Sequence, residues 1–424
     1  MRTILTAIIA LLLLQDIAAQ IVQQDVSAIY IGGHIRRERP ATITRLRNSG
    51  FTTAILFNVH VDADGTLMTD GETICKDGKY VFDATQPYYI SDVQKLKTAP
   101  TSICRIEICI GGWGNDSYDH IRDLINAHGT GEETTLYKNF KALKDAIPEI
   151  DAVNNDDEQC YDSPTAVKFH TMMNTLGYTT TLAPYTNKTF WQRLANGLKD
   201  LGCVDRIMIQ CYDGGAGNNP SQWQLLDAVP VYAGRMYYQD TWDVDYHIGK
   251  YQEWADNNGV TGGFVWVYND ESWDLNAWAA GINRVFKARS ASDDLIAATV
   301  FSQTDYGGYS VKLPVGTYKP AEMACWGIAT NDIASAKVNN GYKLTVYTNS
   351  ICGGRGSTYQ GDNADLGTYA DRAQSLKVEP IEDAIADIES DQQPTAVHDL
   401  QGRKVNPETN NHGIYIINNK KIIK

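Results

Sequence analysis

Two carboxylate side chains near the middle of the chain have the spacing expected of a catalytic acid pair. Segment 149–158 reads EIDAVNNDDE and has the pattern of a strand that ends in acids. Side chains alternate along a strand, so Asn154, Asp156 and Glu158 are predicted to share one face. Like charges this close raise the proton affinity of one member. Glu158 could therefore stay protonated as a general acid while Asp156 is held in hydrogen bonds.

The same segment has a plainer explanation. Acids also cluster in solvated loops and in calcium-binding turns, and short motifs often match by chance. On a strand, Asn155 would face the covering helices, where an unpaired amide costs about 1–3 kcal/mol. We therefore expect Asn155 to have hydrogen-bond partners.

Other predicted strand ends carry groups that suit a sugar site. In the run 109-CIGGWG, Gly111 and Gly112 permit close backbone approach, and Trp113 offers a face for stacking. Each aromatic residue at such a position could equally be core. Further candidates at the strand ends are Gln210, Tyr212, Asp213 and Trp266, with Tyr185, Asn187, Trp191, Trp242 and Trp273 in or near the loops.

The elements that must position these residues alternate along the chain. Eight apolar strand candidates begin near residues 28, 53, 103, 149, 179, 206, 229 and 262, with amphipathic helical stretches between them. This count predicts an α/β fold, a (β/α)8 TIM barrel over residues 25–288, with its chemistry at the C-terminal ends of the strands. A doubly wound open sheet is the alternative, but no Gly-rich dinucleotide fingerprint follows the first strand.

The constellation resembles the family-18 glycoside hydrolases, which include chitinases and endo-β-N-acetylglucosaminidases, over residues 28–287. The family motif D-G-x-[DN]-x-D-x-E appears here as 151-DAVNNDDE. The resemblance implies that Glu158 is the proton donor and that Asp156 orients and stabilises the acetamido group of the substrate. It implies supporting roles for Asp151 and Asn154, to which we add Asp213.

The resemblance also implies a mechanism and a substrate site. The acetamido oxygen of the substrate, not an enzyme carboxylate, would attack the anomeric carbon, with retention of configuration. No metal or cofactor is needed for this chemistry. Tyr212 would help hold the acetamido group. The expected substrate-binding residues are Trp266, which would lie under the sugar, and Trp113, Gly111, Gly112, Tyr185 and Gln210.

Three departures from the family pattern leave alternatives open. Ala152 replaces a usual glycine, Cys109 replaces a frequent serine, and Asn155 replaces a usual apolar residue. A barrel that binds N-acetylglucosamine glycans without cutting them is the second hypothesis, and a calcium-dependent adhesin is the third. The short link between the seventh and eighth strands, enough for one helix, predicts an open groove and favours endo-acting cleavage.

Residues 296–379 form a separate segment rich in Thr, Tyr, Gly and Asn, with an internal repeat of about 40 residues. The pieces 306-YGGYSV, 353-GGRGST, 331-NDIASA and 371-DRAQS resemble a βγ-crystallin-type all-β domain. That family binds calcium through two loops of the form [ND]-[ND]-x-x-[ST]-S, whose oxygens suit a hard cation. The expected ligands are Asn331, Asp332, Ser335, Asp371 and Ser375, although a metal-free domain is an open alternative.

The two ends of the chain have the pattern of export signals. Residues 1–19 have a basic start, a short apolar run and small residues, as in a signal peptide, so we expect a secreted or cell-surface protein with no transmembrane segment in the mature chain. Residues 380–394 are predicted to be an acidic linker. Residues 395–424, with 399-DLQGRKV and 413-GIYIINNKK, resemble the sorting domain of type IX secretion cargo.

Charge and cysteine content bound the partners. The net charge of −14 excludes nucleic acid but not a neutral glycan. We expect a monomer whose partner is an N-acetylglucosamine-containing glycan, such as an N-glycan core or a chitin oligomer. Of the eight cysteines, Cys325 and Cys352 lie in one segment and could form a disulfide.

Overall fold

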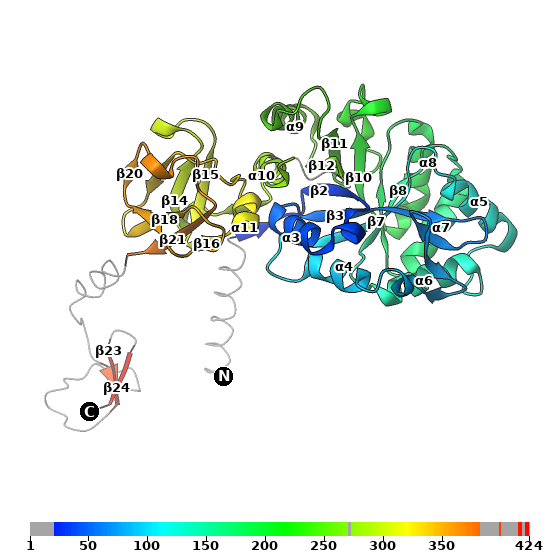
Figure 1. Cartoon of the computed structure of the whole chain (residues 1–424), viewed down its shortest axis with the longest axis horizontal. Coiled ribbons are helices and arrows are strands. Elements are labelled where there is room, and N and C mark those ends of the chain that lie inside the picture. Colours follow the sequence, from blue (N-terminus) through cyan, green and yellow to red (C-terminus); the bar gives the residue numbers. More distant parts are fainter. Residues whose placement is uncertain (1–20, 270–272, 382–397, 400–413, 418–419, 424) are drawn as a thin grey trace.

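The computed structural model describes residues 21–269, 273–381, 398–399, 414–417 and 420–423 (Figure 1). Two separate hydrophobic cores divide residues 21–381 into a barrel and a small β domain. The predicted signal peptide and most of the acidic linker lie outside the described residues. Among the residues that are described, no helix has the length and apolar character needed to cross a bilayer.

Eight parallel strands form a closed barrel, as the sequence predicted. They are β2 (Ser27–Gly32), β3 (Thr53–Val61), β7 (Arg105–Gly111), β8 (Ala152–Asp156), β9 (Thr179–Leu182), β10 (Val204–Gln210), β11 (Val231–Met236) and β12 (Gly262–Tyr268). Their order is β2-β12-β11-β10-β9-β8-β7-β3, and β2 pairs with β3 to close the ring. Because side chains alternate, Ile55 and Met208 pack inside the ring, whereas Leu56 and Ile209 pack against the helices.

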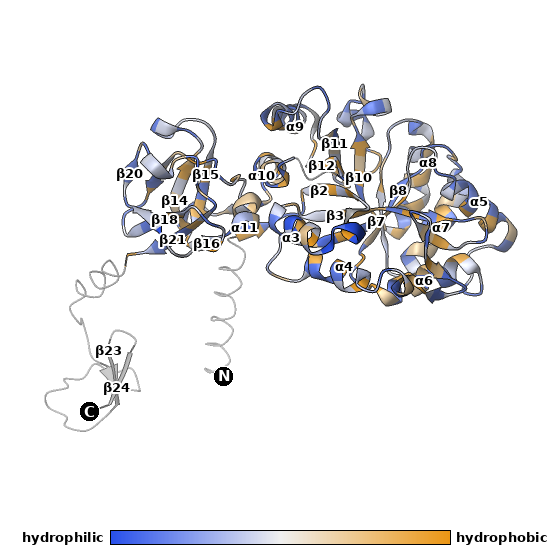
Figure 2. Cartoon of the chain, in the orientation of Figure 1, coloured by the Kyte–Doolittle hydropathy of each residue, from blue (hydrophilic) through white to orange (hydrophobic). Residues whose placement is uncertain are grey.

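Helices surround the ring between most strands. They are α2 (His34–Arg37), α3 (Arg39–Ser49), α4 (Tyr89–Lys97), α5 (Ser117–His128), α6 (Thr135–Ala146), α7 (Ser163–Thr175), α8 (Lys188–Leu198), α9 (Val244–Asn258) and α10 (Leu275–Phe286). They mix hydrophobic and hydrophilic residues along their length (Figure 2). In α5 the buried side chains Tyr118, Ile121 and Ile125 recur at helical spacing.

Two connections depart from simple alternation. After β3, the chain forms the short antiparallel strands β4 (Leu67–Thr69), β5 (Glu72–Lys76) and β6 (Lys79–Tyr80). Between β10 and β11 there are only the 3-10 turns η3 (Asp213–Gly215) and η4 (Pro220–Trp223). The link from β11 to β12 holds the single helix α9, as expected.

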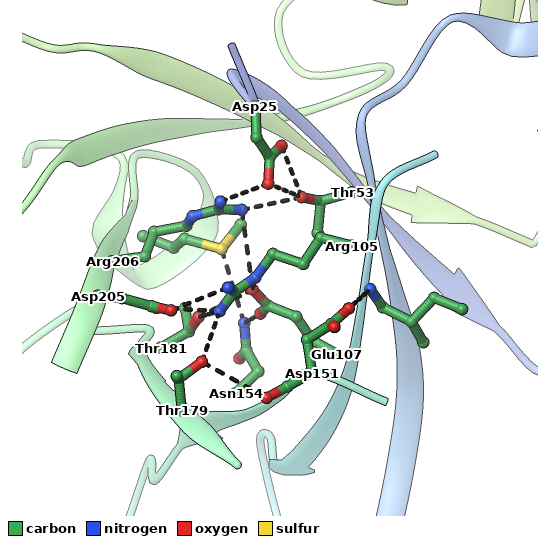
Figure 3. Close-up of polar contacts among 12 residues, drawn as sticks. Asp25, Thr53, Arg105, Glu107, Asp151, Asn154, Thr179, Thr181, Asp205 and Arg206 are labelled. Atoms are coloured by element: carbon green, nitrogen blue, oxygen red, sulfur yellow. Dashed lines mark hydrogen bonds and ion pairs between the residues drawn. The ribbon is translucent and has the colours of Figure 1, made fainter. Parts of the chain in front are cut away.

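A buried polar network fills the N-terminal end of the barrel (Figure 3). The Nε of Arg105 donates to Glu107 at 2.6 Å, and an amino group of Arg206 donates to Asp25 at 2.7 Å. Burial raises the pKa of Glu107, but Arg105 and Arg206 outweigh it, so the pKa lies below its ordinary value. We call Asp25, Arg105, Glu107 and Arg206 the ion-paired plug.

The β domain consists of two four-stranded antiparallel sheets. One has the order β15 (Ser310–Pro314), β14 (Ile296–Phe301), β17 (Ser335–Val338), β20 (Asp362–Asn363). The other has the order β16 (Gly316–Tyr318), β21 (Ser375–Pro380), β18 (Tyr342–Tyr347), β19 (Gly356–Tyr359), and helix α11 (Pro320–Cys325) follows β16. Leu313, Ile328, Leu344 and Leu376 are fully buried in its core.

The remaining elements are short. β1 (Ile21–Gln23) pairs with β13 (Arg289–Ala291), so the two ends of the barrel segment lie together. In the described part of residues 395–424, β22 (His398–Asp399), β23 (Ile414–Ile417) and β24 (Lys420–Ile423) form an antiparallel sheet. The disulfide suggested for Cys325 and Cys352 does not form, because both thiols are free and lie near separate backbone carbonyls.

Candidate functional site

A pocket of about 550 Å³ opens at the C-terminal ends of the barrel strands. Nine of the predicted site residues line it: Gly112, Trp113, Asp156, Glu158, Tyr185, Gln210, Tyr212, Asp213 and Trp266. Phe57 and Gly214 line it too, and the sequence analysis missed both. Gly111 lines an adjoining hollow that shares Phe57, Gly112 and Trp113 with this pocket. The structure therefore brings together groups from β3, β7, β8, β10 and β12.

Asp156 and Glu158 form a carboxyl pair on the floor of the pocket. The Nε2 of Gln210 donates to Oδ1 of Asp156 at 2.8 Å and to Oε1 of Glu158 at 3.3 Å, so one amide bridges both groups. Burial, and then the charges of Glu158 and Asp157, raise the pKa of Asp156 well above its ordinary value. Burial also raises the pKa of Glu158, although its hydrogen bonds to Gln210 and Asp156 oppose the shift.

Both carboxyl groups therefore have a raised affinity for a proton, which belongs to the pair as a whole. Asp156 is only 4% exposed, and Glu158 is partly exposed. No Lys or Arg is among the described residues that line the pocket, so no cation offsets the two acids there.

The backbone around β8 fixes the position of this pair. A Cβ on Gly111 would lie 2.1 Å from the carbonyl oxygen of Asp156, and the amide of Gly112 donates to that oxygen at 2.7 Å. Both glycines have positive φ, so a side chain at either position is also strained. The close backbone approach predicted for the two glycines is present, and it places β7 directly against Asp156.

A loop built on Asp157 carries Glu158. Asp157 is buried, and its carboxylate accepts from the amides of Cys160 at 2.9 Å and Tyr161 at 2.8 Å. Asn155 lies on the opposite face of the strand and bonds Nε2 of His170 at 2.8 Å. Burial lowers the pKa of His170 to about 3, so its neutral imidazole can accept this bond. Asn155 thus has the partner that its position required.

Aromatic rings form one wall of the pocket. Trp266 is stacked on Tyr212 with 6.4 Å between ring centroids and 14° between planes. Phe57 meets Trp266 edge to face at 4.7 Å. Phe57 follows Ile55 on the inward face of β3, so strand alternation alone could have identified it. Trp113 is 91% exposed at the rim, where its ring is free to stack on a ligand.

The far wall is a tight turn after β10. Asp213 has positive φ, and a Cβ on Gly214 would lie 2.9 Å from the ring of Tyr185. Glycine at position 214 therefore lets the Tyr185 ring cover the turn. Trp191 and Trp273, which we considered for subsites, are buried and pack in the outer core instead.

Two predicted supporting residues lie outside the pocket. Asp151 precedes β8, accepts from Nζ of Lys97 at 2.8 Å and also bonds the amide of Ile106, so it belongs to the opposite end of the barrel. Asp151 therefore does not line the pocket. Asn154 lies beneath the pocket, accepts from the hydroxyl of Tyr30 at 3.1 Å and donates to Glu107 at 3.0 Å.

The arrangement suits proton transfer to or from a ring-shaped, hydroxyl-rich ligand. It combines a carboxyl pair whose pKa values are raised, an amide that bridges the pair, and an aromatic wall for stacking. Among the described residues, no group of three or more His, Cys, Asp or Glu side chains is arranged to hold a metal ion.

The calcium loops predicted in the β domain are related by matching contacts. Asn331 and Asp371 both have positive φ. The amide of Asn331 donates to the carbonyl of Ala373 at 2.7 Å, and the amide of Asp371 donates to that of Ile333 at 2.8 Å. Asn331 is therefore the counterpart of Asp371, and the first loop runs over 330–335 rather than 331–336.

This register changes the expected ligands. The hydroxyl of Ser335 donates to the carbonyl of Gln303 at 2.6 Å, as that of Ser375 donates to Asn349 at 2.6 Å. Each serine hydroxyl thus bonds the backbone of a neighbouring hairpin. Each serine is also the last residue of its loop. The carboxylate of Asp332 accepts from the hydroxyl of Tyr309 at 2.7 Å. Asn331 and Asp371 remain as equivalent candidates for calcium ligands through their side-chain oxygens.

Three known proteins are each similar to about a fifth of the chain. No family model matches it. Development-specific protein S of Myxococcus xanthus is 35% identical over 80 residues, which is 19% of this chain and 46% of that protein, so the chain spans about half the length of this relative. The solved N-terminal domain of protein S is 33% identical with a TM-score of 0.20, and a βγ-crystallin domain from Flavobacterium johnsoniae is 29% identical with the same score. Each of these two structures matches 20% of this chain and is itself covered to 97%.

The similarity to Development-specific protein S is in line with the βγ-crystallin-like sequence repeat of the small β domain.

Proposed function

We propose that the barrel is a TIM-barrel glycoside hydrolase of the family-18 type, which cleaves β-linkages at N-acetylglucosamine with retention of configuration. The carboxyl pair of Asp156 and Glu158, bridged by Gln210 beneath the Trp266 wall, is the observation that carries the proposal. The substrate class follows from the resemblance of 151-DAVNNDDE to the family motif.

In the proposed reaction, Glu158 protonates the glycosidic oxygen as the bond to the anomeric carbon breaks. The acetamido oxygen of the substrate forms the new bond to that carbon and gives an oxazolinium ion. Water then opens this ring, Glu158 takes a proton from the water, and the product leaves with its original configuration.

The raised pKa of Glu158 supports this sequence, because it favours the protonated form that donates to the glycosidic oxygen. Glu158 gives up this proton in the first step and takes one from water in the second. An ionised Asp156 would stabilise the positive charge of the oxazolinium. The aromatic wall and the exposed Trp113 would hold the sugar rings.

The test compares wild type with Glu158→Gln on chitin oligomers and high-mannose glycopeptides. We expect kcat to fall by about 10²–10⁴-fold, the usual contribution of general acid–base catalysis. Glu132→Gln removes an exposed carboxylate and serves as the matched control. Cello-oligosaccharides, which lack the acetamido group, should not be cut.

Two results would refute the proposed hydrolase activity or the role of Glu158 in it. If wild type releases no product from either substrate but binds it, the barrel is a glycan-binding protein. If Glu158→Gln is as active as wild type, another group donates the proton.

The rest of the chain fits a secreted role for this enzyme. Export through the signal peptide of residues 1–19, and sorting through residues 395–424, would bring a monomeric hydrolase to the cell surface or beyond. The β domain would bind calcium weakly, with Asn331 and Asp371 as side-chain ligands. Adding calcium in place of a chelator should then raise Tm slightly, and Asp371→Ala should abolish that rise.

A further inference from the structure

The barrel and the β domain are locked together where α10 and α3 meet α11 (Figure 1). A Cβ on Gly50, at the end of α3, would lie 2.2 Å from Cβ of Ala324, so the two backbones touch. The Nδ2 of Asn283 donates to the carbonyls of Gly50 at 2.8 Å and Ala324 at 2.9 Å. One buried amide thus joins both domains.

A second set of contacts flanks this junction. The Oδ1 of Asn276 accepts from the amide of Thr330 at 2.9 Å. Arg284 donates to the carbonyl of Gly327 at 2.8 Å, and its guanidinium lies 3.6 Å from the ring centroid of Tyr309. These bonds fix the first loop of the β domain against the barrel, so a cavity between the domains would be preformed.

Such a cavity is present and measures about 350 Å³. Asn48, Tyr268 and Trp273 belong to its barrel wall, and Asn331 and Gln374 to its β-domain wall. Its lining shares no residue with the catalytic pocket. The volume lies within the range of about 300–1,000 Å³ typical of small-molecule sites.

The lining has the chemistry of a site for an uncharged, hydroxyl-rich ligand. Carboxamides that can donate and accept come from both walls, and Trp273 is an aromatic member of the barrel wall.

The two charged groups of the lining already have partners. Arg45 donates to the hydroxyl of Tyr268 at 3.3 Å. Asp274 accepts from the amides of Asn276 and Ala277 at 3.0 Å each and caps α10. Because both charged side chains already make hydrogen bonds within the protein, the cavity favours an uncharged ligand over an ionic one.

We infer that the cavity between the barrel and the β domain is a second binding site, for a neutral sugar unit. It holds the ligand between Trp273 and the two amides of the β domain, Asn331 and Gln374. This site is separate from the catalytic pocket, and it does not depend on whether the barrel cleaves glycans.

The test uses isothermal titration calorimetry on the full chain carrying Glu158→Gln, so that no probe is cut. The probes are N,N′-diacetylchitobiose and cellobiose. Asn331→Ala/Gln374→Ala removes the amides of the β-domain wall, and Trp273→Phe removes part of the aromatic surface of the barrel wall. Asn340→Ala, an exposed amide of the same domain that does not line the cavity, is the matched control.

We expect the double variant to weaken one binding event at least tenfold for at least one probe, and Trp273→Phe to weaken the same event. Asn340→Ala should bind as the parent does. Equal affinity and stoichiometry in the double variant, or no binding of either probe to the parent, would overturn the inference. With Glu158 restored, hydrolysis of short chitin oligomers should be the same with and without Gln374→Ala, so this result and that of the catalytic test are independent.

Discussion

The two ends of the barrel interior are both polar and buried, but arginines pair with the acids at only one of them. At the N-terminal end, Glu107 bonds Arg105, and Asp25 bonds Arg206 (Figure 3). Burial raises the pKa of both acids, but the arginines outweigh it and bring each below its ordinary value. At the C-terminal end, Asp156 lacks such a partner and its pKa is raised instead.

The contrast shows that burial alone does not set the role of an acid. A buried carboxylate beside arginines stays ionised and joins strands together. A buried carboxyl beside another carboxyl has a raised pKa, which reduces stability where the carboxyl is ionised but permits acid–base chemistry. Changes in the ion-paired plug should therefore mainly alter the free energy of unfolding, and changes in the carboxyl pair should mainly alter activity.

Removing Glu107 should have the largest effect on stability. Glu107→Ala leaves Arg105 and Arg206 without their shared buried acid, and breaking a buried ion pair costs about 3–5 kcal/mol. The free energy of unfolding, measured by urea denaturation, checks this value. Glu132→Ala, at an exposed carboxylate, should leave stability unchanged.

The pH dependence of this loss has a definite sign. Because the folded pKa of Glu107 is lowered, its stabilisation is present above the unfolded value of about 4.3 and declines as pH falls through the folded pKa. The gap between wild type and Glu107→Ala should therefore narrow in acid. A gap that widens in acid would contradict the assignment of an ionised Glu107.

Asp156→Asn should have the opposite sign. The folded pKa of Asp156 is raised, so wild-type stability falls as pH rises from the unfolded value of about 3.9 up to the folded one. Asparagine does not titrate, so the variant should gain stability relative to wild type over this range, by about 1.4 kcal/mol for each unit of the raised pKa. Urea denaturation at pH 4, 6 and 8 measures the gain. Constant relative stability would show that Asp156 is not protonated in the fold.

Gln210→Ala should change the titration of the pair rather than the fold. The amide of Gln210 lowers the pKa of both carboxyl groups by donating to them. Without it, the basic limb of the kcat/KM profile should move upward by roughly one pH unit, the size of a lost charge-assisted hydrogen bond of about 1.5 kcal/mol. Gln192→Ala, on the outer helix α8, is the control for a lost amide. An unmoved limb would show that the pair does not set the profile.

Local patterns were enough to predict the barrel and most of the pocket. Strand alternation has a period of two, so it placed Asn154 and Asp156 inward without knowledge of the tertiary contacts. The same rule placed Asn155 outward, where His170 satisfies it. Phe57 and Tyr30 also face inward by the same rule, so strand alternation was sufficient to predict their positions.

The failures arose where distant residues decide the outcome. Asp151 fits a sequence motif, but β8 begins at Ala152, and Lys97 from α4 holds Asp151 at the other end. The calcium-loop register depends on the positive φ of Asn331 and on contacts with the second repeat. The cavity between the domains joins Trp273 to Gln374, and no local pattern links them.

Tyr30→Phe should have the smallest effect and tests whether the two ends act separately. The Tyr30 hydroxyl donates to Asn154, and Asn154 donates to Glu107. The ring centroids of Tyr30 and Trp266 are 5.3 Å apart. Tyr30 therefore links the plug to the pocket. Loss of one hydrogen bond should cost about 1 kcal/mol in urea denaturation. The pH profile of kcat/KM should not move, because Asn154 and Glu107 keep their bond and neither touches Glu158. A shift in the profile would mean that the plug sets the proton affinity of the pair, and the division between a structural end and a chemical end would be lost.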